Sequence, residues 1–89
     1  MFPAKKHKTV FDPHYERIIK DLVNIRYDKG LTTREFGAKS GYSQCFIGRT
    51  ETKERRLDLV EVIYYMKYLG LSKKEIKSKL VEWADLFVE

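Results

Sequence analysis

The chain is poor in the residues that build covalent or metal frameworks. Its 89 residues include a single cysteine, Cys45, and two histidines, His7 and His14. One cysteine excludes an internal disulfide, and these three side chains do not supply the four ligands of a structural zinc site. We therefore expect no metal ion and no other cofactor.

Long apolar runs and catalytic groupings are also missing. No stretch reaches the roughly 18 apolar residues of a membrane span, and the N-terminus lacks the apolar stretch of a secretion signal. These absences predict a cytoplasmic protein without a membrane partner. No nucleophile with a base, no phosphate-binding loop and no pair of catalytic carboxylates stands out, so we do not expect an enzyme.

Charge, in contrast, is abundant and unevenly placed. The net charge is +5. Residues 1–11 contain three lysines and no acidic residue, and residues 31–56 contain six basic and three acidic residues, whereas residues 57–89 contain five basic and six acidic ones. Positive charge gathered in this way favours a nucleic-acid partner, although solvated surface charge is the alternative. We expect residues 1–11 to form a flexible basic arm and residues 12–89 to form one domain.

Apolar residues recur at helical spacing along the whole domain. This periodicity predicts an all-α fold of five helices without a strand. The first helix begins at Asp12-Pro13, a cap followed by proline, and ends before Gly30. Its expected core face is Tyr15, Ile18, Leu22 and Ile25, and that of the fourth helix is Leu59, Val62, Ile63, Met66 and Leu69.

Residues 32–51 have the capping pattern of two short helices joined by a turn. Thr32 and Glu35 match a capping box, Ser43 can cap a second helix that starts at Gln44, and Gly41 provides the positive φ of the turn. Further capping boxes are expected at Asp58 with Glu61 and at Ser72 with Glu75, and Gly70 ends the fourth helix. This layout predicts a helix-turn-helix over residues 32–51.

The region Leu22–Leu71 resembles the Cro and phage-repressor family of helix-turn-helix proteins, also called Xre-like. The similarity lies in Gly30-Leu31-Thr32 with Glu35, in Gly41, Ser43, Ile47, Arg49 and Glu51, and in the stretch from Glu54 to Glu61, which is similar to the ERRLDVVE stretch of one subgroup. The resemblance implies a five-helix repressor-type domain, here with an extended C-terminal helix, whose third helix enters the major groove of DNA.

The resemblance also implies roles for individual residues. Gln44, Cys45 and Arg49 would face the bases, since an amide can bond adenine and a guanidinium can bond guanine. Arg49 has an alternative in holding a phosphate. Contacts to the DNA backbone would come from Thr33, Arg34, Lys39, Ser43, Phe46, Lys53, Arg55 and Arg56. Phe46 has an alternative in packing against its own fold, and Arg55 and Arg56 have one in pairing with Asp58 or Glu61.

Arg26 and Glu51 match a pair that, in the family, connects the first helix to the third. A guanidinium and a carboxylate suit a partly buried bidentate bond, which would orient the recognition helix. Four positions depart from the family pattern. Thr33 stands where many members have a glutamine, Gly37 in place of alanine, Gly48 in place of a larger residue, and Lys53 where many members have a glycine.

A second apolar surface lies in the C-terminal part of the chain. The helix predicted over residues 72–89 has apolar residues on one face, and two tyrosines of the fourth helix lie outside its predicted core face. This surface can fold back over the first helix or pair with a second subunit. The candidate dimer residues are Tyr64, Tyr68, Ile76, Leu80, Trp83 and Phe87.

Together these patterns predict a DNA-binding transcriptional regulator, a repressor that binds a pseudo-palindromic operator on double-stranded DNA as a homodimer. The alternative is an antitoxin-like interaction module, which binds a protein partner and regulates its own synthesis through DNA binding. The apolar C-terminal helix is the sequence support for that alternative.

Overall fold

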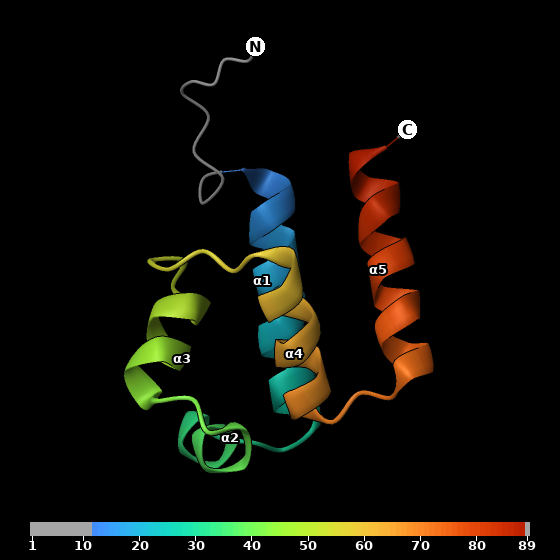
Figure 1. The fold of residues 1–89 in the computed structure, drawn as a ribbon. Coiled ribbons are helices and arrows are strands. Elements are labelled where there is room, and N and C mark those ends of the chain that lie inside the picture. The colour runs from blue at the N-terminus through green and yellow to red at the C-terminus, as the bar shows by residue number, and fades with distance from the viewer. Residues whose placement is uncertain (1–11, 89) are drawn as a thin grey trace.

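Five α-helices form the computed structural model, which describes residues 12–88 (Figure 1). They are α1 (Pro13–Asp28), α2 (Thr33–Ser40), α3 (Gln44–Glu51), α4 (Leu59–Leu69) and α5 (Lys73–Phe87). The described residues contain no strand, so the all-α prediction is confirmed. The predicted basic arm, residues 1–11, lies outside the described residues.

The helix boundaries follow from local capping chemistry. Asp12 accepts the N–H of His14 at 2.7 Å, and Pro13 occupies the first turn of α1. Three complete capping boxes open other helices, formed by Thr32 with Glu35, Asp58 with Glu61 and Ser72 with Glu75. Gly41 and Gly70 adopt φ of 87° and 101° and end α2 and α4, because glycine enters the left-handed region without a steric cost.

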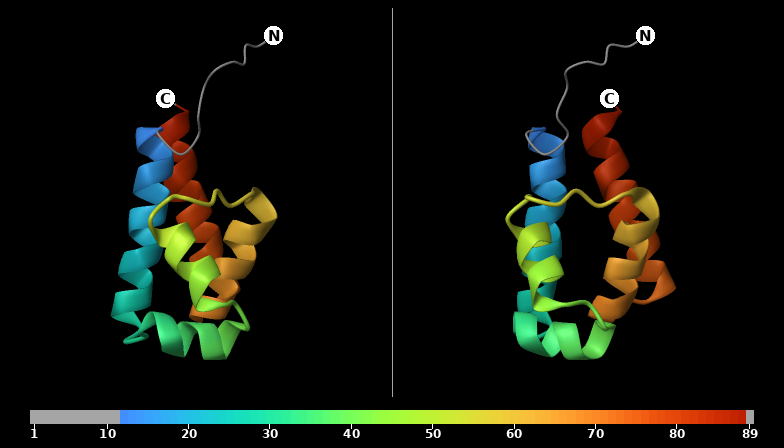
Figure 2. Two further views of the ribbon diagram at one scale, coloured as in Figure 1. Left: turned by 90° about the vertical axis from the view of Figure 1, so that its left-hand side faces the viewer. Right: turned by 60° about the vertical axis from the view of Figure 1, so that its left-hand side comes forward.

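The helices enclose one core. α1, α4 and α5 run along roughly the same direction, α2 lies across one end, and α3 lies on the side away from α5 (Figures 1 and 2). α1 contacts α3, α4 and α5, and α4 also contacts α2 and α5. The largest fully buried side chains come from four of the helices and are Tyr65, Phe36, Leu22, Ile47, Met66, Leu69 and Thr50.

The predicted core face of α4 is partly wrong. Val62, Met66 and Leu69 are buried as expected, but Leu59 is 66% exposed and Ile63 is 36% exposed. Tyr65, which the sequence did not assign to the core, is 1% exposed, and its ring packs edge-on against that of Phe36 with 5.0 Å between centroids. Because α4 is apolar on both sides, its periodicity did not determine which side faces inward.

The buried line of α1 is also displaced from the predicted one. Ile19 and Arg26 are buried together with Tyr15 and Leu22, whereas Ile18 and Ile25 are half-buried. Three helices pack against α1, so residues on most of its sides are at least partly covered. Which of these residues are fully buried depends on tertiary packing.

α5 folds back on α1, which was one of the two arrangements expected for the C-terminal helix. Trp83 is 4% exposed, and its Nε1–H donates to Asp21 Oδ2 at 2.8 Å. Arg17 of α1 pairs with Glu82 of α5 at 3.1 Å. Trp83 therefore belongs to the core of the monomer and is not available as part of a dimer surface.

The other candidate dimer residues divide into two groups. Ile76, Leu80 and Tyr68 are half-buried against the core. Tyr64 and Phe87 remain 48% and 51% exposed. Of the six candidates, only these last two present about half of their surface for another chain.

Candidate nucleic-acid interface

The third helix has a buried side and an exposed side. Ile47 and Thr50 are 0% exposed and hold α3 against the core. Ser43 caps the helix by accepting the N–H of Phe46 at 3.0 Å. The opposite side presents Gln44, Cys45, Gly48 and Arg49, all exposed, and we call these four residues the α3 outer face.

The α3 outer face contains the three residues expected to face bases. Gln44 and Arg49 supply an amide and a guanidinium, and Cys45 supplies a small thiol. A Cβ added at Gly48 would meet no atom within 4 Å, so the centre of this face is open. The four residues share exposure on one side of α3.

A partly buried ion pair connects the end of α3 to α1, in the bidentate geometry expected from the sequence. Arg26 Nε–H donates to Glu51 Oε2 at 2.7 Å, and its Nη2–H donates to Oε1 at 3.0 Å. The remaining Nη1–H donates to the carbonyl of Leu31 at 2.7 Å. The hydrogen bonds to Glu51 raise the pKa of Arg26 above its ordinary value. Since Arg26 is 5% exposed, this pair orients α3 from inside the fold.

Close approach at the turn explains one departure from the family pattern. A Cβ at Gly37 would lie 3.0 Å from the carbonyl oxygen of Tyr42 and 3.6 Å from Ile47 Cδ1. The first distance is too short for an ordinary contact with backbone. Glycine at this position lets α2 approach the turn that leads into α3.

Phe46 packs against its own fold, which was the alternative to a contact with DNA. Its ring centroid lies 4.6 Å from that of Tyr42, and the guanidinium of Arg55 lies 4.7 Å from the Phe46 centroid. The side chain is half-buried. Phe46 is therefore a packing residue beside the α3 outer face.

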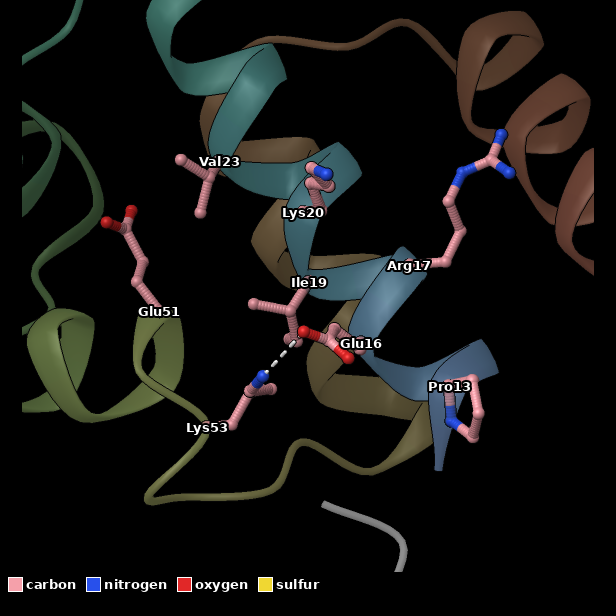
Figure 3. Close-up of a pocket in the computed structure, with 8 residues that line it drawn as sticks. All are labelled: Pro13, Glu16, Arg17, Ile19, Lys20, Val23, Glu51 and Lys53. Carbon is pink, nitrogen blue, oxygen red and sulfur yellow. Dashed lines mark ion pairs between the residues drawn. The ribbon is translucent and has the colours of Figure 1, made fainter. Parts of the chain in front are cut away.

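Two residues predicted to contact phosphates are held by acidic partners. Lys53 adopts φ of 66°, the left-handed conformation expected at a position where glycine is common, and its Nζ lies 3.1 Å from Glu16 Oε2 (Figure 3). Arg55 donates to both carboxylate oxygens of Glu61, at 3.3 and 2.9 Å. The Lys53 pair lies at a cleft of about 460 Å³ between α1 and the end of α3.

The other residues predicted to contact the DNA backbone lie in different environments. Arg34 and Arg56 are exposed, and Thr33 is half-buried. The hydroxyl of Ser43 serves as the α3 cap. Lys39 extends toward the C-terminal end of α4, where its Nζ lies 3.2 Å from the place of a Cβ at Gly70; a lysine there complements the partial negative charge of the helix end.

Glu16 is a site residue that the sequence did not reveal. It is 37 positions from Lys53, and no spacing rule connects the two. Among residues 12–88, no group of three histidine, cysteine or acidic side chains could hold a metal ion. No helix within that range is both long and apolar enough to cross a bilayer.

Comparisons of the chain with protein-family models, curated proteins and solved structures give no match. The resemblance to the Xre-like family therefore rests on the residues named above.

Proposed function

We propose that the chain is a sequence-specific DNA-binding transcriptional regulator, which represses by binding a pseudo-palindromic operator as a homodimer. In this proposal α2, the turn and α3 act as a helix-turn-helix, and α3 enters the major groove. The observation that carries the proposal is the α3 outer face, exposed on a helix whose opposite side is buried and whose terminal carboxylate is paired with the buried Arg26.

The roles of the α3 outer face follow from its chemistry. The Gln44 amide would bond N6 and N7 of an adenine, and the Arg49 guanidinium would bond O6 and N7 of a guanine. Gly48 leaves open space between them, which lets the helix backbone approach the base edges. Cys45 would contribute a small apolar contact, for example with a thymine methyl group.

Contacts to phosphates would use the positive charge of residues 31–56. Arg34 is exposed, whereas Lys53 and Arg55 would have to exchange acidic partners for phosphates. Each phosphate neutralised contributes roughly −0.9 to the slope of log affinity against log salt. Replacing Lys53 by alanine should therefore change this slope less than replacing Arg34.

Selection of bound duplexes from a random pool tests the proposal. We expect the wild type to enrich one pseudo-palindromic sequence. Gln44→Ala and Arg49→Ala should each lose preference at different positions of that sequence, with a discrimination of about 1–3 kcal/mol removed per bidentate contact. Lys77→Ala, on an exposed part of α5, is the matched control and should select the wild-type sequence.

Two outcomes would contradict the proposal. Either the wild type enriches no sequence, or both α3 variants select the wild-type sequence with unchanged strength. An antitoxin-like module remains the alternative function. Its sequence support is weaker in the folded chain, because Ile76, Leu80 and Trp83 pack within the monomer.

A further inference from the structure

α4 is apolar on two sides, but the described fold buries only one. Nine of its eleven residues are aliphatic, aromatic or methionine, and Glu61 and Lys67 are the two charged ones. Opposite the buried side, Leu59, Val60, Ile63 and Tyr64 are 66%, 59%, 36% and 48% exposed. We call these four residues the α4 outer face. A helix that is apolar all round is normally covered all round.

No other described element covers the α4 outer face. In Figure 1, α4 lies in front of α1, and in the left view of Figure 2 it stands at the right-hand edge of the helices. α1, α2 and α5 pack against α4, and the exposure of these four residues shows that the packing lies on its other side. A contiguous apolar surface of this kind marks an interaction site.

The direction in which α3 faces limits how two copies can pair. In the left view of Figure 2, α3 faces the viewer and α4 runs nearly across the line of sight. Consider a twofold axis that is parallel to the line of sight and passes beside α4. Rotation about this axis places the α4 of a second copy next to the first α4, in antiparallel orientation. The same rotation keeps both copies of α3 on the viewer's side, as binding of one duplex by two subunits requires.

Charge on α4 also fits an antiparallel pair. The exposed N-terminal end carries the carboxylate of Asp58, and the exposed C-terminal end carries Lys67. If Ile63 lies at the twofold axis, Lys67 of one copy lies beside the partner's Asp58. A parallel pair would instead place like charges side by side, which is unfavourable.

The exposed side of α5 lacks this self-complementarity. Its exposed Val81 stands near Lys73, Lys74 and Lys77, and two copies meeting there would bring lysines together. Val81 therefore provides a matched control, because it is exposed and apolar but lies on another surface.

We propose that the chain forms a homodimer through the α4 outer face, with the two α4 helices antiparallel and Ile63 at the twofold axis. The inference rests on the proposed function in one respect, the orientation of both α3 helices toward one duplex. Its test contains no DNA, so the dimer and the DNA-binding function can fail separately.

Sedimentation equilibrium of the full chain, at submillimolar concentration, measures the dimer directly. We expect a dimer for the wild type and for Val81→Glu. Ile63→Glu would place two carboxylates at one apolar axis and should raise the dissociation constant at least about a hundredfold. Far-UV circular dichroism and the melting temperature establish that each variant is folded.

Cross-linking gives an independent measurement of the position of the axis. In a Cys45→Ser background, Ile63→Cys should be joined to its copy by a short bismaleimide, whereas Val81→Cys should not. A monomeric wild type, a dimer that Ile63→Glu leaves intact, or cross-linking at position 81 in place of 63 would each overturn the inference.

Discussion

Two arginine–glutamate pairs flank α3, and they have nearly the same geometry in different surroundings. Arg26 and Glu51 join α1 to the end of α3, with side chains 6% and 16% exposed and a closest contact of 2.7 Å. Arg55 and Glu61 join the segment after α3 to α4, with side chains 41% and 31% exposed and a contact of 2.9 Å. Solvation, and not bond length, distinguishes the two.

The difference shows which pair determines the position of α3. If one partner of a buried pair is removed, the other charge stays buried with little solvation, and the free energy of unfolding falls by a large amount. Water can replace a lost partner at an exposed pair, which contributes little to stability. The Arg26–Glu51 pair therefore orients α3, whereas the Arg55–Glu61 pair holds the connecting segment.

Glu51→Ala is expected to have the largest effect. It leaves the buried guanidinium of Arg26 with one remaining acceptor, the Leu31 carbonyl, and should lower the free energy of unfolding by about 3–5 kcal/mol. Urea denaturation measures the loss. Glu61→Gln, which keeps an acceptor for the Asp58 N–H, is the matched control and should cost a small fraction of that amount; equal losses would contradict the distinction between the two pairs.

Two buried tyrosines extend the comparison to uncharged groups. The hydroxyl of Tyr15 accepts the N–H of Leu57 at 3.0 Å, whereas that of Tyr65 has no hydrogen-bond partner among the described residues. Tyr15→Phe strands the Leu57 N–H and should cost about 1–3 kcal/mol. Tyr65→Phe leaves no hydrogen-bonding group without a partner, so it should be neutral or stabilising in the same urea titration. A larger loss for Tyr65→Phe would show that its hydroxyl has a partner.

The smallest expected effect is the pH dependence of the stability that Glu61 contributes. Hydrogen bonds from Arg55, and then from the Asp58 N–H, hold the pKa of Glu61 below its ordinary value of 4.5. A carboxyl group whose pKa is lower in the folded chain than in the unfolded chain stabilises the fold at a pH above its unfolded pKa. This stabilisation disappears as the pH falls through the pKa of the folded chain. Glu61→Gln should therefore lower the melting temperature slightly near neutral pH and leave it unchanged well below pH 4.5. A difference that grows on acidification would contradict this assignment.

Local chemistry made much of the fold predictable from the sequence. Capping residues such as Thr32 and Asp58 act within four positions, so their patterns appear in any window that contains them. The Arg26–Glu51 pair was predictable only through the family resemblance, because 25 residues separate its members. The family resemblance also identified Lys53 as an unusual residue for its turn, because many members have a glycine there.

Tertiary choices were less predictable. The sequence shows that α4 is apolar but not which side turns inward, and so Leu59 and Ile63 were misassigned. It shows that Lys53 is basic but not that Glu16 lies within reach of it, whereas pairing of Arg55 with Glu61 was one of the alternatives that the sequence left open. Such contacts depend on how helices pack, and periodicity along one helix does not contain that information.

The central claim is that the α3 outer face meets DNA, and an NMR titration of the chain with its selected duplex tests it most directly. We predict saturable amide shifts that are largest for residues 43–49, with smaller shifts at the start of α2 and almost none around Val81 on α5. The largest shifts on α5, or no saturable shift on α3, would contradict the claim.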